Sequence, residues 1–227
     1  MDLLKARLTL AVSKAAASYS CPDNDTKCAL IENRHTDAQV YVQDCHPTHR
    51  NLKYDKIISF RGTSSKADIF ADLKIYRRIP EFFKKHKMQG RVHSGFLAQY
   101  ESVRDQVHQM ANVDTSTHIM VTGHSLGGAL ATLCALDLAI TNPSLDVDCI
   151  TFGSPRVGCK RFVKLFTDRV HKHVRCVHNN DLVTKIPIAF RFKHTPGKLK
   201  LTTPGSWIPT PIKDHEIVRY TDGIKAL

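Results

Sequence analysis

The segment from Gly123 to Gly128 reads Gly-His-Ser-Leu-Gly-Gly, and it lies between a strand-like apolar run at 119–122 and a helical apolar run at 129–140. A strand that passes directly into a helix must turn sharply. Glycines two residues before and two residues after Ser125 remove the Cβ atoms that would collide in such a turn. The residue at the tip is held in a strained conformation that pushes its side chain outward. The segment therefore predicts a nucleophile elbow with Ser125 as the nucleophile.

Strand-like and helical runs alternate along the middle of the chain. We expect an N-terminal amphipathic helix within 1–20, strands at 39–43, 56–60, 119–122, 147–152 and 173–177, and helices at 97–110, 126–140 and 157–166. This alternation predicts an α/β fold with a mostly parallel central sheet flanked by helices. With 227 residues, 42% of them hydrophobic, the chain is expected to form one domain over 1–227. Its longest apolar stretch is broken by polar residues and glycines, so no transmembrane segment is predicted.

A partner acid and a base are expected later in the chain, and the acid should follow a strand, because reactive groups gather at the carboxyl ends of strands in such a sheet. Asp181 follows the strand at 173–177, and its alternative role is to cap a turn. The chain order serine, acid, histidine leaves His194 and His215 as bases. We prefer His215 because it precedes an amphipathic run that could hold an imidazole, although a histidine can also be a core or solvated residue. His215 would then take the proton of Ser125, and Asp181 would orient the imidazole.

Oxyanion donors are expected in two places. The backbone N–H of Leu126, directly after the nucleophile, is one of them. The strand at 56–60 ends in a polar turn led by a glycine, and Thr63 in that turn is the candidate for the second donor.

Several motifs follow one another in order along most of the chain, and together they resemble the class 3 (fungal-type) lipases. They are Phe60-Arg61-Gly62-Thr63, His93-Ser94-Gly95-Phe96, the elbow around Ser125, the run from Thr151 to Gly158, and Asn179-Asn180-Asp181. The resemblance implies an α/β-hydrolase fold, hydrolysis of carboxylic esters, a triad of Ser125, Asp181 and His215, and oxyanion donors at Thr63 and Leu126. It also implies that His93 and His124 lie beside the site, and that neither a metal nor an organic cofactor is needed.

The same resemblance implies a lid between the first oxyanion residue and the His-x-Gly-Phe motif. The segment from Ser65 to Ala71 fits this place, with Ile69 and Phe70 as apolar contacts. An ordinary surface helix is the alternative. The short stretch between Asp181 and His215 departs from the family by trimming its usual insert.

The net charge of +12, from 33 Lys and Arg against 21 Asp and Glu, is concentrated partly in residues 77–91. Such a cluster favours an anionic lipid surface as a partner, and a solvated basic face is the alternative. Nucleic acid is not expected as a partner, because no recognised binding motif or aromatic ladder accompanies the charges. A metal site is not expected either. Alternation along a strand sends His171 and His173 to one face and Cys176 and His178 to the other.

Seven cysteines cannot all pair, and three of them fall inside apolar runs, so a reducing, cytoplasmic location is expected. The apolar core at 8–12 is short for a signal peptide. Secretion is the alternative, and a disulfide could then join two of Cys21, Cys28 and Cys45.

Taken together, these features predict a serine carboxylic ester hydrolase that acts on glycerolipids in the manner of a triacylglycerol lipase. Three alternatives stay open: a phospholipase of the same fold, a small-ester esterase, and a catalytically silent protein that binds lipid surfaces. A silent relative would be expected to have lost Ser125, Asp181 or His215, and all three are present.

Overall fold

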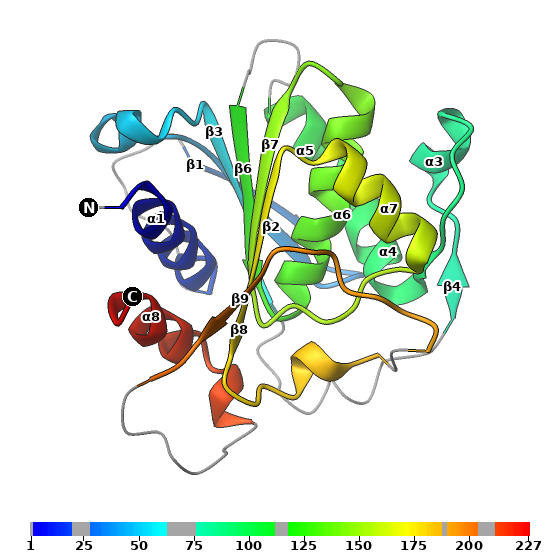
Figure 1. The fold of residues 1–227 in the computed structure, drawn as a ribbon. Helices are drawn as coiled ribbons and strands as arrows, with labels where there is room; N and C mark the ends of the chain where they lie inside the picture. The colour runs from blue at the N-terminus through cyan, green and yellow to red at the C-terminus, as the bar shows by residue number, and fades with distance from the viewer. Residues whose placement is uncertain (1, 20–27, 63–75, 112–117, 188–189, 204–211) are drawn as a thin grey trace.

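A seven-stranded sheet forms the centre of the molecule in the computed structural model, which describes residues 2–19, 28–62, 76–111, 118–187, 190–203 and 212–227 (Figure 1). The strand order is β1-β2-β3-β6-β7-β8-β9. The β1–β2 and β2–β3 pairs are antiparallel, and every later pair is parallel. The strands are β1 (Cys28–Asn33), β2 (Ala38–Asp44), β3 (Lys56–Phe60), β6 (His118–His124), β7 (Asp146–Phe152), β8 (Lys172–His178) and β9 (Lys198–Leu201).

Helices cover both faces of this sheet (Figure 1). On one face lie α1 (Leu3–Ala17) and α8 (Ile217–Lys225), and on the other lie α4 (Ser94–Glu101), α5 (Arg104–Met110), α6 (Leu126–Thr141) and α7 (Lys160–Arg169). Shorter elements complete the described chain: β4 (Arg77–Arg78) paired with β5 (Val92–His93), α3 (Glu81–Lys85), and the 3₁₀ turns Pro47–Leu52, Val183–Lys185 and Lys213–His215. The apolar core accordingly has two parts, one on each face.

The sequence-predicted strands at 39–43, 56–60, 119–122, 147–152 and 173–177 are confirmed. Two edge strands, β1 and β9, were not predicted. The single helix expected at 97–110 is two helices, because the Ser102 hydroxyl donates to the carbonyl of Gln99 and competes with the helical ladder. The helix expected at 157–166 begins only at Lys160, since Gly158 forms isolated β-bridges with Val92 and Lys193.

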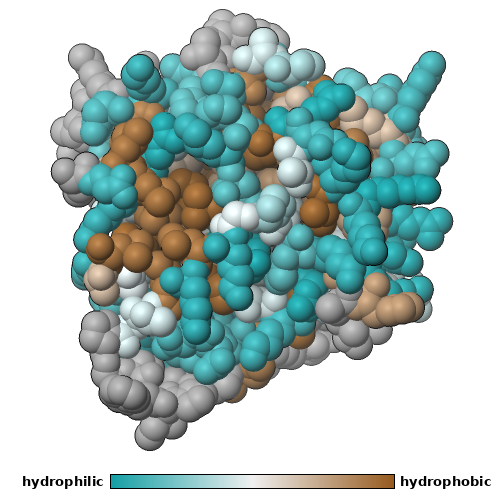
Figure 2. Space-filling model, viewed as in Figure 1, coloured by the Kyte–Doolittle hydropathy of each residue, from teal (hydrophilic) through white to brown (hydrophobic). Residues whose placement is uncertain are grey.

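The helix α1 is amphipathic in the expected sense, except at Leu4. Leu8, Ala11, Val12 and Ala15 are buried, whereas Leu4 is 43% exposed. In the face shown in Figure 2, apolar side chains gather over the α1 side of the molecule, and hydrophilic side chains cover most of the side of α7 and β4. No helix in the described part of the chain is both long enough and apolar enough to cross a membrane.

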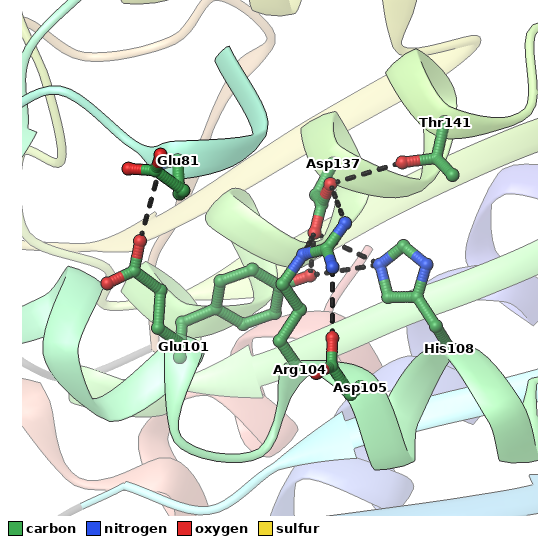
Figure 3. Close-up of polar contacts among 8 residues, drawn as sticks. Glu81, Glu101, Arg104, Asp105, His108, Asp137 and Thr141 are labelled. Carbon is green, nitrogen blue, oxygen red and sulfur yellow. Dashed lines mark hydrogen bonds and ion pairs between the residues drawn. The ribbon is translucent and has the colours of Figure 1, made fainter. Parts of the chain in front are cut away.

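A buried carboxylate ties α4 and α5 to α6 (Figure 3). Asp137 on α6 accepts hydrogen bonds from the Tyr100 hydroxyl (2.7 Å), from Arg104 through Nε (2.6 Å) and Nη2 (3.0 Å), and from Thr141 (3.2 Å), and it contacts His108 Nε2 at 3.0 Å. Burial raises the pKa of Asp137, but the hydrogen bonds from His108 and Arg104 outweigh burial, and the pKa lies below its usual value. These bonds keep the carboxylate ionised inside the helical layer.

The buried cysteines behave as small apolar residues. Cys134, Cys149 and Cys176 are buried thiols, and burial raises the pKa of each. Cys28 lies in strand β1. Cys21 lies outside the described residues, so the disulfide that secretion would allow stays an untested alternative.

Candidate active site

Ser125 stands at the tip of the turn between β6 and α6. Its φ of 58° and ψ of −127° are strained for a residue with a side chain. The turn requires glycine on both sides. A Cβ at Gly123 would lie 2.3 Å from the carbonyl oxygen of Gly127, and a Cβ at Gly127 would lie 2.2 Å from that of Phe60. The strand-to-helix elbow expected from the sequence is therefore present.

The imidazole of His215 connects Ser125 to Asp181. The Ser125 Oγ lies 2.7 Å from His215 Nε2, and His215 Nδ1 lies 2.8 Å from Asp181 Oδ2. All three side chains are buried. With the proton on Nδ1, the imidazole has its Nε2 lone pair directed at the serine hydroxyl, which is the arrangement for proton removal from Ser125.

Asp181 is held by three donors. Its Oδ1 accepts the N–H of Val183 at 2.8 Å, and its Oδ2 accepts the hydroxyl of Tyr220 at 2.5 Å in addition to His215. Burial and the Asp181 charge raise the pKa of Tyr220, so its proton stays on the phenol. Gly153 lies against this pair with a φ of 60°, where a Cβ would approach Asp181 Oδ2 to 2.8 Å.

His124 packs behind His215. The two rings are stacked with centroids 4.6 Å apart, and His124 Nε2 donates to the backbone carbonyl of His215 at 2.6 Å. On the other side, the Tyr19 hydroxyl lies 3.0 Å from His124 Nδ1. Burial, together with the charge of His215, lowers the pKa of His124 to about 3. His124 is therefore neutral and supports the backbone that carries His215.

The residue before His215 anchors the turn that carries it. The Asp214 carboxylate is buried and lies 3.5 Å from His178 Nδ1, while Asn179 Nδ2 and the N–H of Asn180 each donate to it at 3.4 Å. His178 ends β8, and Asn179 and Asn180 follow it directly in the loop that leads to Asp181. The network therefore ties the turn of His215 to the loop of Asp181. Sequence reasoning did not find Asp214, and its position beside the candidate base was the only available signal.

Of the two expected oxyanion donors, Leu126 lies among the described residues. Leu126 is the first residue of the sixteen-residue helix α6, where backbone N–H groups have no partner within the helix. Thr63 and the expected lid from Ser65 to Ala71 lie outside the described residues. His93 is buried and caps α4 by accepting the N–H of Phe96 at 3.4 Å, and its ring packs against Phe96 and Phe192. Its role beside the site stays a prediction.

The other histidines weighed from the sequence lie elsewhere. His194 is hydrogen bonded to the carbonyl of Thr184 at 2.6 Å, and burial lowers its pKa to about 3. His173 packs against Phe166 of α7, whereas His178 packs against Tyr220 of α8. These two lie on opposite faces of the sheet, as alternation predicts. His171 precedes β8 and contacts Asp148 instead.

The chain is similar to lipases and to a phospholipase in sequence, and to a lipase in structure. A family model described as Lipase (class 3) matches residues 57–191. The chain is 33% identical to the secreted mono- and diacylglycerol lipase 1 of Fusarium solani, over 90% of this chain and 60% of that protein. It is 31% identical to the chloroplastic phospholipase A(1) DAD1 of Arabidopsis thaliana, over 76% of this chain and 43% of that protein. The structure of the Rhizomucor miehei lipase propeptide complex superposes with a TM-score of 0.68 and 27% identity, over 98% of this chain and 77% of that one. The chain thus spans about two fifths to three fifths of the length of these two curated relatives.

Proposed function

The chain belongs to the class 3 lipase family, and from this premise we propose that it hydrolyses carboxylic esters of glycerolipids through an acyl-enzyme on Ser125. The fold predicted from the sequence, that of the α/β-hydrolases, is confirmed by the likeness to the Rhizomucor miehei lipase and by the mostly parallel sheet between two helical layers. The activity, the substrates and the partners of the whole protein are inferences from this membership and from the site.

One observation carries the proposal: the imidazole of His215 bridges the hydroxyl of Ser125 and the carboxylate of Asp181. In the proposed mechanism Ser125 Oγ attacks the ester carbonyl carbon while its proton passes to His215 Nε2, and Asp181 stabilises the imidazolium. The imidazolium then gives that proton to the leaving alcohol. Water, activated by the same imidazole, releases the fatty acid and restores Ser125.

The oxyanion of each tetrahedral intermediate needs donors that are already in place. We propose the N–H of Leu126 at the start of α6 as one donor and Thr63 as the other. The helix macrodipole adds to the first, because partial positive charge collects at a helix N-terminus. Loss of one such donor costs about 3 kcal/mol of transition-state stabilisation.

A phospholipase is the second candidate function, and two observations favour it. One relative is named as a phospholipase A(1). In addition, a groove on the protein surface is lined by five cationic residues beside Phe190, which is 90% exposed; the cations are Arg77, Lys160, Arg161, Arg191 and Lys193. We propose that this groove contacts anionic lipid surfaces. It differs from the patch expected at 77–91, because Arg77 joins residues from α7 and from 190–193, while Lys84 pairs with Glu81.

Binding to vesicles of phosphatidylcholine alone, and of phosphatidylcholine mixed with phosphatidylglycerol, tests the groove. At low salt the protein should prefer the anionic vesicles. The double variant Arg161→Gln with Lys193→Gln should lose that preference, and Lys225→Gln on α8 should keep it. Equal binding of the wild type to both vesicles would contradict the proposal.

The activity is tested by the release of fatty acid from a medium-chain triacylglycerol emulsion, a phospholipid and a soluble short-chain ester. The wild type should release acid from at least one of them, and Ser125→Ala should release none while keeping its fold. If the folded wild type releases nothing from all three, the silent lipid-binding alternative is favoured. The ranking of the three substrates separates a lipase, a phospholipase and an esterase.

Two further expectations stay proposals. We propose that residues 1–227 form one domain, because α1 and α8 pack together on the sheet to which residues 28–201 contribute all seven strands. The Fusarium relative is named as secreted, which favours export over the cytoplasmic location expected from the sequence. Detection of the protein in culture medium after expression of its full-length gene product tests the location.

A further inference from the structure

A second group of polar side chains gathers at the end of the sheet opposite to Ser125. His118 begins β6, whereas Ser125 follows the end of the same strand, seven residues later, a separation of about 20 Å. Asp148 lies near the start of β7, and His171 precedes β8. Three neighbouring strands therefore bring two imidazoles and one carboxylate to a single edge, far from the candidate triad.

The three side chains are close enough to share one ion. One ligand atom from each of His118, Asp148 and His171 lies within 4.8 Å of the other two. His171 Nδ1 lies 2.9 Å from Asp148 Oδ1, and His118 Nε2 lies 3.3 Å from Asp148 Oδ2. The two imidazole rings meet edge to face, with centroids 5.7 Å apart. Nδ1 of His171 and Nε2 of His118 therefore face the same carboxylate.

The Nε2 atom of His118 is buried beside the carboxylate of Asp148. It is closed off from solvent and lies 3.3 Å from Oδ2 of Asp148, an oxygen that already accepts hydrogen bonds from Arg7 and Tyr54. A long contact to a shared carboxylate oxygen satisfies a buried ring nitrogen poorly, and a metal ion between the imidazole and the carboxylate would bind both of them.

The carboxylate is also supported as a metal-binding carboxylate usually is. Asp148 Oδ2 accepts hydrogen bonds from Arg7 Nη1 at 3.0 Å and from the Tyr54 hydroxyl at 2.8 Å. These donors fix the carboxylate and leave Oδ1 on the side of His171 for an ion. Outer donors of this kind orient the ligands in metal sites.

We propose that His118, Asp148 and His171 form a zinc site in which water completes a tetrahedral coordination. Two imidazole nitrogens and one carboxylate oxygen suit Zn²⁺ and not Mg²⁺ or Ca²⁺, which prefer oxygen ligands. The side chain of His171 is 37% exposed, so the site opens to solvent on that side. The positive charge of Arg7 opposes the ion, and the affinity is correspondingly moderate.

Zinc binding would stabilise the sheet. Zinc would fasten β6, β7 and β8 together at their amino-terminal edge, and Arg7 extends this connection to α1. Because the site is remote from Ser125, zinc is expected to raise the melting temperature without changing hydrolysis of a soluble ester. The proposal does not depend on the proposed function, and the sequence alone did not indicate this set of residues.

Isothermal titration calorimetry of the metal-free full chain with ZnCl₂ tests the site. The wild type should bind one Zn²⁺ with saturation, and Co²⁺ in its place should give the intense visible absorption of a tetrahedral complex. His171→Ala removes a half-exposed ligand and should weaken binding about tenfold or more. His118→Ala should do the same. His35→Ala changes an exposed histidine elsewhere and should bind as the wild type does.

Arg7→Gln provides a test of opposite sign, because removal of the opposing charge should tighten zinc binding. Absence of saturable binding by the wild type would overturn the proposal. Unchanged affinity in a folded His171→Ala variant would also overturn it, since the ion would then be held by other surface histidines.

Discussion

Asp137 and Asp181 are two buried carboxylates with closely similar partners and different surroundings. Each accepts the hydroxyl of a buried tyrosine, Tyr100 for Asp137 and Tyr220 for Asp181. Each also contacts one histidine nitrogen at about hydrogen-bond distance, from His108 at 3.0 Å and from His215 at 2.8 Å. Residue types alone do not separate the two clusters.

The difference is an arginine. Arg104 binds both oxygens of Asp137, so that carboxylate has a permanent counter-ion (Figure 3). Among the described residues, the one ion-pair partner of Asp181 is His215. A carboxylate without an arginine is neutralised only when its histidine takes up a proton, as happens when Ser125 loses one. We infer that the Asp137 cluster stabilises the fold, and that the Asp181 cluster is poised for proton transfer.

Among substitutions in the two clusters, Asp181→Asn is expected to have the largest effect, and that effect is on activity. The amide has nearly the shape of the carboxylate, but it favours the wrong tautomer of His215 and no longer stabilises the imidazolium. We expect kcat to fall about ten-thousand-fold on a soluble ester, with circular dichroism unchanged. A variant that keeps more than a tenth of the wild-type activity would remove Asp181 from the triad.

The equivalent substitution in the other cluster, Asp137→Asn, should lower stability and leave activity unchanged. It leaves Arg104 without its buried counter-ion, and breaking such a pair costs about 3 kcal/mol of unfolding free energy. Urea unfolding measures this loss, and activity below the melting transition should equal that of the wild type. Asp105→Asn is the control, because Asp105 also contacts Arg104 but its side chain is 94% exposed. A loss of activity in folded Asp137→Asn would contradict the structural role.

A smaller effect is expected from the two tyrosines. Tyr220→Phe removes a hydrogen bond to the charged Asp181, and such a bond contributes about 1.5 kcal/mol, so kcat/KM should fall about tenfold. Tyr100→Phe removes the equivalent bond from Asp137 and should lower stability alone. Comparison of kcat/KM and of the urea midpoint for both variants separates these roles. Equal activity of Tyr220→Phe and the wild type would show that the Tyr220 hydroxyl does not position Asp181.

Much of the fold follows from local signals in the sequence. The buried strands β3, β6 and β7 are short apolar runs bounded by turns, and α6 is apolar apart from Thr132, Asp137 and Thr141. The edge strands β1 and β9 escaped prediction because both are short and largely unburied, with one buried residue each, and lysines alternate with leucines in β9. Edge strands form because a neighbour supplies the hydrogen bonds, and a single sequence does not reveal that neighbour.

Part of the candidate site also follows from local sequence signals, and part depends on contacts between distant segments. The elbow at Ser125 is a local signal, and chain order together with strand ends led to Asp181 and His215. The supporting groups Tyr220 and Asp214 depend on contacts between distant segments, so local pattern does not identify them. For the same reason, the sequence did not distinguish the carboxylate that is paired with an arginine from the one that is not.

The smallest expected effect is in the acid dependence of stability. An Asp carboxyl in the unfolded chain has a pKa of about 3.9, whereas the bonds from His108 and Arg104 hold the pKa of folded Asp137 lower despite burial. Stabilisation by Asp137 is therefore complete above about pH 4 and is lost as the pH falls through the folded pKa. Between about pH 4 and 3, the unfolding free energy of the wild type should fall more steeply than that of Asp137→Asn, by at most about 1.4 kcal/mol per pH unit. Some slope should persist in the variant, because hydrogen bonds hold the pKa of Asp148 at about 2 against the effect of burial. Asp105→Asn should keep the wild-type slope, and equal slopes in Asp137→Asn and the wild type would show that the arginine pair does not set the contrast between the two carboxylates.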